Sequence, residues 1–166
     1  MAGALALGTL TGTTLPTAQA AEITGITPTI TVVTSEVDYW SAFSVDIAFD
    51  VPPTARGGDT FTLRLADELR MMGTPVDLRT PTGALVATAV ADGPVLTYTF
   101  TDFVNTHANV RTRLNFWVEL ERSLVARGET VSVDVLVNQV RIDGPDVSTE
   151  PDPGTGPELN SIDKWM

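Results

Sequence analysis

The stretch from Phe43 to Val51 reads FSVDIAFDV, and its apolar and polar side chains alternate over nine positions. Successive side chains of a β-strand point to opposite faces of a sheet, so this period of two predicts a strand with one buried face and one solvent-facing face. The same alternation returns in four further segments: Phe61–Leu65, Leu96–Phe100, Leu114–Leu120 and Val131–Val137. Segments of this kind predict an all-β protein.

Turn-forming residues separate these strands, and two antiparallel sheets packed as a sandwich are the architecture that such spacing predicts. The turns are Pro52-Pro53, Gly57-Gly58-Asp59, Pro81-Thr82-Gly83, Asp92-Gly93-Pro94 and Arg127-Gly128-Glu129. We expect further strands within Ile26–Val33 and Val86–Val90. Only Asp67–Met72 and Thr101–Val110 have a composition that allows a helical turn, and neither has the periodicity of a longer helix.

The first twenty residues have the features of a secretory signal. Ala4–Leu10 is rich in Ala, Leu and Gly, and Ala18-Gln19-Ala20 has the small-x-small form of a cleavage site. We therefore expect residues 1–20 to be a signal peptide that is removed after Ala20. The first basic residue is Arg56, so the basic segment with which a signal normally starts is missing, and we expect the signal to begin upstream of Met1.

The rest of the chain divides into three parts by composition. With 166 residues in total, one folded domain is expected, and we place it at residues 21–142. Residues 143–158 (DGPDVSTEPDPGTGPE) have the composition of a linker. Residues 159–166 (LNSIDKWM) regain apolar side chains, and we interpret them as the start of a following domain that is cut off.

Charge and cysteine content exclude several classes of partner and chemistry. The chain has 21 acidic and 10 basic residues, a net charge of -11, and its basic residues form no cluster. Nucleic acids and anionic membranes are therefore poor partners. After residue 20 no apolar run is long enough to cross a bilayer, so the mature domain is not expected to insert into a membrane. The chain has no cysteine, which excludes disulfides, thiolate metal sites and cysteine nucleophiles.

The residues that could carry catalysis are few. The single histidine, His107, lies in the polar run Asn105–Asn109 and is expected in a solvated loop. The acid pairs Glu119/Glu121 and Asp46/Asp50 fall on the outward faces of their strands, where acidic residues are common. No regular series of acid ligands for calcium is present. We therefore predict that the protein is not an enzyme and has no metal site and no cofactor.

Trp117 is the one large aromatic that the alternation places on an outer face, opposite the register of Phe116 and Val118. Two interpretations are open. A long side chain or a loop covers the indole, or the indole is an exposed contact surface for a partner.

Three segments resemble, in order and spacing, the matrix-binding surface adhesins of Gram-positive cocci and actinobacteria, such as clumping factors, serine-aspartate repeat proteins and collagen adhesins. They are VPPTARGGDTFTL (Val51–Leu63), TYTFTDFVN (Thr97–Asn105) and Val110–Val133. The second segment is the most specific of the three, and it consists of Thr97, Tyr98, Thr99, Phe100, Thr101, Asp102, Phe103, Val104 and Asn105.

The resemblance implies a variant Ig-like fold that forms half of a two-domain clamp. In such adhesins an extracellular protein segment docks between two Ig-like domains, and a strand from the second domain adds itself beside the strand that carries the signature. Thr97–Asn105 is therefore the predicted site of strand addition. The implied partners are a fibrinogen- or collagen-like protein and a following Ig-like domain of the same parent chain. The implied location is the cell surface, anchored to the wall through a region outside this sequence.

The resemblance has departures, and other functions compete with it. Phe103 replaces the usual Tyr, and Ala66-Asp67-Glu68-Leu69 replaces the usual Pro-x-Gly turn. The signature is alternatively only a well-packed strand and turn, in which Asp102 accepts backbone N–H groups. The main alternative function is a stalk or pilus-type spacer without its own ligand. A carbohydrate-binding module, based on Trp117, comes third.

Overall fold

The computed structural model describes residues 20–154. Within this range the chain forms strands and one short helix. The expected signal peptide, apart from Ala20, and the expected start of a following domain at residues 159–166 lie outside the described residues. The strands are β1 (Thr29–Val32), β2 (Glu36–Val37), β3 (Phe43–Asp50), β4 (Thr60–Leu65), β5 (Leu69–Met72), β6 (Leu78–Arg79), β7 (Leu85–Asp92), β8 (Val95–Phe100), β9 (Arg111–Leu120), β10 (Thr130–Ser132), β11 (Val135–Val137), β12 (Val140–Ile142) and β13 (Asp146–Thr149).

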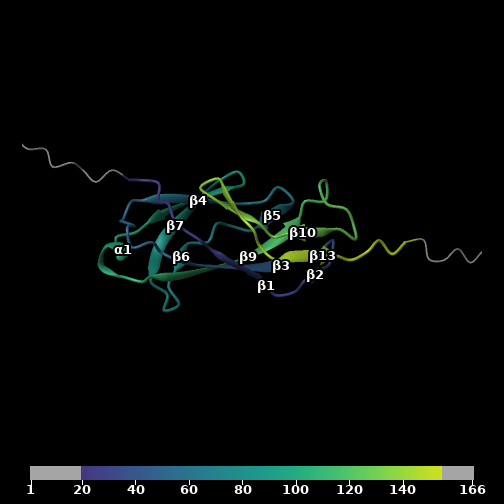
Figure 1. Cartoon of the computed structure of the whole chain (residues 1–166), viewed down its shortest axis with the longest axis horizontal. Helices are drawn as coiled ribbons and strands as arrows, with labels where there is room; N and C mark the ends of the chain where they lie inside the picture. Colours follow the sequence, from purple (N-terminus) through teal and green to yellow (C-terminus); the bar gives the residue numbers. More distant parts are fainter. Residues whose placement is uncertain (1–19, 155–166) are drawn as a thin grey trace, which may run out of the picture.

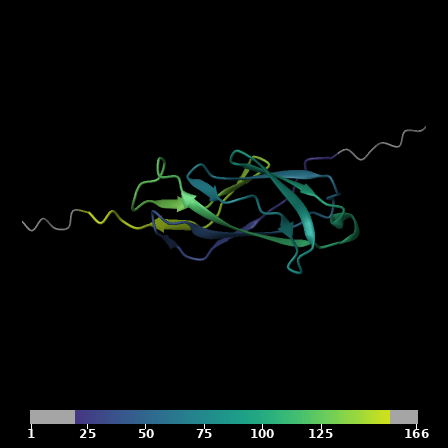
Figure 2. The same ribbon diagram turned by 180° about the vertical axis from the view of Figure 1, so that it is seen from behind.

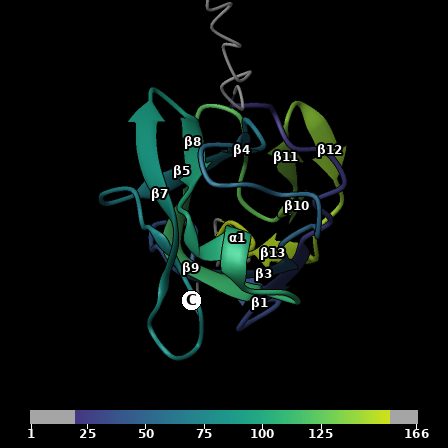
Figure 3. The same ribbon diagram turned by 90° about the vertical axis from the view of Figure 1, so that its left-hand side faces the viewer.

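The larger sheet is antiparallel throughout and is strongly curled. Its strand order is β1-β3-β9-β6-β7-β8-β4-β11-β12, and β5 pairs with β9 next to β6. Viewed along the long axis, the strands surround a common interior (Figure 3). Because the sheet curls over, β3 and β9 face β4 and β8 across the core. The predicted antiparallel β-sandwich is confirmed.

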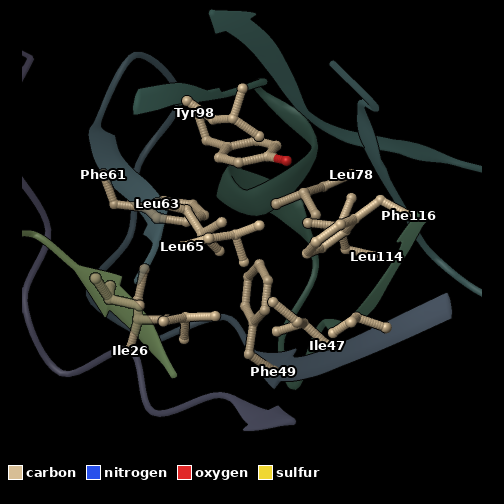
Figure 4. Packing of buried hydrophobic residues seen from close by; sticks show 14 of the residues in the cluster. Ile26, Ile47, Phe49, Phe61, Leu63, Leu65, Leu78, Tyr98, Leu114 and Phe116 are labelled. Atoms are coloured by element: carbon tan, nitrogen blue, oxygen red, sulfur yellow. The ribbon is translucent and has the colours of Figure 1, made fainter. Parts of the chain in front are cut away.

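The core is centred on Phe61 of β4. Its ring stacks on Tyr98 of β8 with the ring centroids 5.0 Å apart, and it meets Phe49 of β3 edge-on at 5.5 Å. Leu114 and Phe116 of β9 close the core from the opposite side (Figure 4). The alternation from Phe43 to Val51 holds in full, since every second residue, beginning with Phe43, is buried and the residues between them are not.

A second, smaller sheet joins β10, β13 and β2, and its β13–β2 pair is parallel. β13 lies inside the segment that composition assigns to a linker. In β13, Val147 is 0% exposed and Thr149 is 4% exposed, and the Thr149 hydroxyl donates to the carbonyls of Ala126 and Glu129. The domain boundary expected after Ile142 is therefore wrong. A strand this short has only two inward side chains, and two apolar or small residues among Pro, Gly and Asp give no recognisable alternation in the sequence.

The alternating run Val131–Val137 is not one strand. All four of its valines are buried, but β10 and β11 belong to different sheets. The corner between them is held by Asp134, whose carboxylate accepts hydrogen bonds from Ser132 Oγ (2.5 Å), Arg141 Nε (2.6 Å) and Gly144 N (2.9 Å). The period of two predicts burial correctly here but does not reveal the change of sheet.

The two segments expected to allow a helical turn behave differently. Thr101–Val110 contains the single-turn helix α1 (Phe103–Thr106). Asp67–Met72 instead contains strand β5, so a helical turn there is wrong, because pairing with Trp117–Leu120 of β9 supplies the backbone hydrogen-bond partners of this short segment. Within residues 20–154 no helix has the length and apolar character needed to span a membrane.

Candidate functional site

The predicted site segment Thr97–Asn105 begins in β8 and continues into α1. Leu96, Tyr98 and Phe100 are buried, at 4%, 0% and 2% exposure. The threonines between them lie half-buried on the opposite face of the strand. The alternation of inward and outward side chains in β8 is therefore confirmed.

Both edges of β8 are occupied. One edge pairs with β4 and the other with β7 along nearly its whole length. The expectation of an open edge directly beside the signature strand is therefore wrong for this structure. The hairpin partner β7 covers that edge, because the tight turn at Gly93-Pro94 brings it back along β8.

The end of the signature holds the Gly57-Gly58-Asp59 turn in place. Asn105 Oδ1 accepts a hydrogen bond from Gly57 N (2.9 Å), and Asn105 Nδ2 donates to Asp102 Oδ1 (3.1 Å). A side chain at Gly57 would displace the Asp102 carboxylate, so a larger residue there would disturb this contact. The Asp102 carboxylate thus accepts from an amide side chain, and it does not cap the backbone N–H groups of α1, so the alternative expectation for Asp102 is wrong. Two motifs from separate parts of the sequence form one structural unit.

The open edge lies one strand farther out, on the second half of β7. β6 pairs with β7 only as far as Ala87, so within residues 20–154 the segment Thr88–Asp92 pairs with β8 alone. The carbonyl of Val86 accepts a hydrogen bond from Thr101 N, so the backbone groups of Val86 face β8. Every second residue of a strand points its backbone groups to the same side, so those of Thr88 and Val90 face β8 as well. The backbone groups of Ala89 and Ala91 therefore face outward. Ala89 N donates to Asp77 Oδ1 (2.9 Å), whereas the N–H and the carbonyl of Ala91 have no partner in the part of the chain that the structure describes.

A groove runs between this edge of β7 and the outer edge of β5. One edge of β5 pairs with β9. The other edge does not pair with β7, whose pairing with β6 ends at Ala87, and we call the gap between β5 and β7 the split. The split holds a cavity of about 450 Å³. Its apolar lining includes Leu65, Leu69, Met71, Pro75, Pro94 and Leu96. An extended segment inserted in the split would meet backbone donors and acceptors above an apolar floor.

Charged side chains surround the mouth of the groove. Arg70 Nη2 donates to Glu119 Oε2 (2.7 Å), and this contact raises the pKa of Arg70. Hydrogen bonds from Ser123 hold the pKa of Glu121 below its usual value. Arg64 pairs with Asp67, while its Nε is a buried donor with no hydrogen-bond partner in the described part of the chain. An inserted backbone carbonyl would satisfy such a donor.

Trp117 is exposed to 55%, so no side chain or loop covers it, and the interpretation of a covered indole is wrong. It pairs across the sheet with Met72 of β5, which is exposed to 38%, and with Ser44 of β3. Directly opposite residues of an antiparallel pair share one face, so Trp117 and Met72 form a small apolar patch on the outer face.

The candidate catalytic groups are engaged locally. His107 stacks on Phe103 with the ring centroids 3.8 Å apart, and its Nδ1 lies 2.9 Å from the Phe103 carbonyl. Asp46 pairs with Arg113, and Asp50 pairs with Arg111. Among residues 20–154 no three His, Asp or Glu side chains are grouped to hold a metal ion. These positions offer no arrangement of nucleophile, base and orienting group.

Comparison with known proteins gives a family match and matches to curated relatives. The family described as bacterial Ig domain matches residues 36–130. Serine-aspartate repeat-containing protein E of Staphylococcus aureus is 26% identical over 87 residues, which are 48% of this chain and 8% of that protein. The chain thus matches less than a tenth of the length of this relative.

Solved structures with a similar fold include surface proteins of several Gram-positive bacteria. The serine-rich repeat protein Srr2 from Streptococcus agalactiae has a TM-score of 0.57 and 20% identity, covering 81% of this chain and 48% of that one. The collagen adhesin CNA from S. aureus has a TM-score of 0.52 and 17% identity, covering 82% and 47%. A variant of BcpA, the major pilin subunit of Bacillus cereus, has a TM-score of 0.52 and 15% identity, covering 76% and 40%. The likeness shows an Ig-like β-sandwich fold.

Proposed function

Because this chain belongs to the bacterial Ig domain family, we propose that it is a cell-surface adhesion module, one half of a clamp that holds an extracellular protein segment by docking and β-strand addition. The other half of the clamp is a following Ig-like domain of the same parent protein. The ligand is a fibrinogen- or collagen-like protein. The location is the outer surface of a Gram-positive cell, with anchoring to the wall through another part of the parent.

The observation that carries this proposal is the split between β5 and β7. Ala91 of β7 and Met71 of β5 lie on the strands that flank the same apolar cavity. Backbone hydrogen bonds along such an edge supply affinity without reading a specific sequence, and side-chain pockets supply the specificity. The signature strand β8 then supports β7 from behind rather than receiving the added strand itself.

Replacing the free N–H of Ala91 tests this proposal. In Ala91→Pro one outward donor is lost, while the β8 pairing of β7 stays possible because the N–H of Ala91 points away from β8. Ala91→Val is the matched control, since it keeps the N–H and favours a strand. We expect Ala91→Pro to weaken binding of the two-domain parent to immobilised fibrinogen or collagen by about tenfold or more, and Ala91→Val to bind like the parent.

The measurement is surface plasmon resonance, with thermal unfolding as the check that both variants are folded. If a folded Ala91→Pro variant binds as tightly as the parent, strand addition at β7 is excluded. If the parent binds neither immobilised protein, the adhesion function itself is refuted for these ligand classes.

The spacer function remains the second candidate, and the shape of the molecule favours it. The described chain enters at one end of the long axis and leaves at the other, as two opposite views agree (Figures 1 and 2). Domains of this form join end to end as a stalk without further contacts. A spacer predicts that Ala91→Pro leaves adhesion of whole cells unchanged, so the same variant separates the two functions.

A further inference from the structure

A second surface lies at the end of the molecule where the described C-terminus leaves, beside β2, β10 and β13 (Figure 1). Tyr39 and Trp40 occupy the turn between β2 and β3, and Arg122 and Arg127 belong to the loop between β9 and β10. The Arg122 guanidinium carbon lies 4.8 Å from the centroid of the Trp40 ring. The Arg127 guanidinium carbon lies 5.3 Å from the Tyr39 ring and 5.7 Å from the Trp40 ring. We call these four residues the arginine–aromatic cluster.

The aromatic part of this cluster is fixed before any ligand arrives. Tyr39 donates its hydroxyl hydrogen bond to Val125 O (2.9 Å), and Val125 is 3% exposed. Trp40 meets the Tyr39 ring edge-on with the centroids 5.2 Å apart, yet it remains 60% exposed. Guanidinium groups held against such rings keep a defined orientation, and their N–H groups stay free at the edge of the plane.

Neither guanidinium of the cluster forms an ion pair within residues 20–154, although the chain has a large excess of acidic residues. Five other arginines form ion pairs: Arg64, Arg70, Arg111, Arg113 and Arg141. Two nearby carboxylates instead accept hydrogen bonds from residues of the β9–β10 loop. Glu121 accepts from Ser123 Oγ (2.8 Å), and Glu129 accepts from Ala126 N (2.8 Å). Within residues 20–154 the two oriented guanidinium groups therefore form no ion pair, although the charge of Arg122 adds to the hydrogen bonds from Ser123 that lower the pKa of Glu121.

The cluster lines a hollow of about 580 Å³, which also includes Leu124, exposed to 57%. Glu129 and Asp152 also line this hollow. A dense polyanion would be repelled by these carboxylates and by the net charge of -11. A single carboxylate flanked by an apolar side chain suits two guanidinium forks, an open indole face and Leu124.

We propose that the arginine–aromatic cluster binds an acidic peptide segment of a partner protein, in which a carboxylate lies next to an aromatic or aliphatic side chain. The carboxylate accepts hydrogen bonds from Arg122 and Arg127, and the neighbouring apolar side chain packs on Trp40 and Leu124. This surface is separate from the β5–β7 groove, so the inference does not depend on strand addition.

The test is a titration of the full chain, labelled with ¹⁵N, with the blocked peptide acetyl-Gly-Asp-Phe-Gly-amide. The readout is the indole N–H signal of Trp40, and the indole of Trp117 on the outer face of β9 serves as the internal reference. We expect the Trp40 signal to shift saturably and the Trp117 signal to stay in place. The analogue with Asn in place of Asp should bind about tenfold more weakly or worse, because it lacks the charge-assisted hydrogen bonds.

Variants assign the effect to the cluster. Arg122→Gln combined with Arg127→Gln should abolish the shift of the Trp40 signal. Arg111→Gln is the matched control, since it removes an arginine whose side chain is 81% exposed on β9 and should leave the titration unchanged. Equal affinity for the Asp and Asn peptides, or no shift of Trp40, overturns the proposal. Tighter binding of a heparin-derived tetrasaccharide than of the peptide also overturns it, because a sulfated glycan would then be the better ligand.

Discussion

At the scale of single residues, Asp134 holds the corner where the chain passes from one sheet to the other. It is 3% exposed, and it joins the corner between β10 and β11 to Arg141 of β12 and to the backbone of Gly144. Gly144 fits only as glycine, because an added side chain would overlap the Val133 carbonyl. Burial by itself would raise the pKa of Asp134, but hydrogen bonds from Ser132, Gly144 and Arg141, with the charge of Arg141, outweigh burial and lower it.

This lowered pKa predicts a pH dependence of stability. The carboxylate stabilises the fold above its unfolded pKa of 3.8, and this contribution is lost as the pH falls through the lower folded pKa. We expect Asp134→Asn to lower the free energy of unfolding by about 2 kcal/mol at pH 7. The gap between wild type and variant should narrow below pH 3.8. Urea titrations at pH 7 and pH 3 measure it, and a gap that stays constant would contradict the assigned role.

At the scale of elements, the signature strand β8 contributes side chains to the core and pairs with the neighbouring strand β7. Its inner side chains stack in the core, and its outer edge is occupied by β7. Tyr98 shows how complete the burial is, since removal from water raises the pKa of its phenol and its hydroxyl donates to Val76 O (3.2 Å). The edge that remains for a partner therefore belongs to a neighbouring strand.

Two neighbouring positions of β8 should differ sharply in their effect on stability. Phe100→Ala should lower the free energy of unfolding by about 3–5 kcal/mol, because Phe100 packs against Phe61 and truncation leaves a cavity. Thr99→Ala should cost less than about 1 kcal/mol, because Thr99 lies on the outer face. Denaturant midpoints of the two variants measure the difference, and equal midpoints would show that the assigned faces are wrong.

At the scale of the whole molecule, the fold is closed by a strand that follows the apparent end of the domain. β13 lies between β10 and β2 in the smaller sheet, so the last strand holds an early and a late segment of the chain together. The same closing sheet lies at the end that carries the arginine–aromatic cluster (Figure 1). The smaller sheet thus contributes to stability at the same end of the molecule as the proposed peptide-binding surface.

Truncation tests this arrangement. A chain of residues 21–142 loses β13 and uncovers its neighbours Val131 and Val37, which are 7% and 3% exposed in the intact fold. We expect it to be less stable than residues 21–154 by at least about 2 kcal/mol, since a buried valine and a row of backbone hydrogen bonds are lost. Thermal unfolding of both chains is the measurement. Equal melting temperatures of the two chains would show that the folded domain ends at Ile142 after all.

The amino-acid sequence by itself determined the class of fold, the faces of the long strands and the family. Side chains of β3, β8 and β9 alternate because each strand has one face in the core, and this local periodicity is visible without any partner. Only the tertiary structure decided which edges are open, because strand order depends on pairing between distant segments. It moved the candidate site from β8 to the split between β5 and β7, and it placed Asp146–Thr149 inside the fold. It also brought Tyr39 and Trp40 beside Arg122 and Arg127, which are more than 80 positions away in the chain, since long-range contacts leave no periodic trace in the sequence.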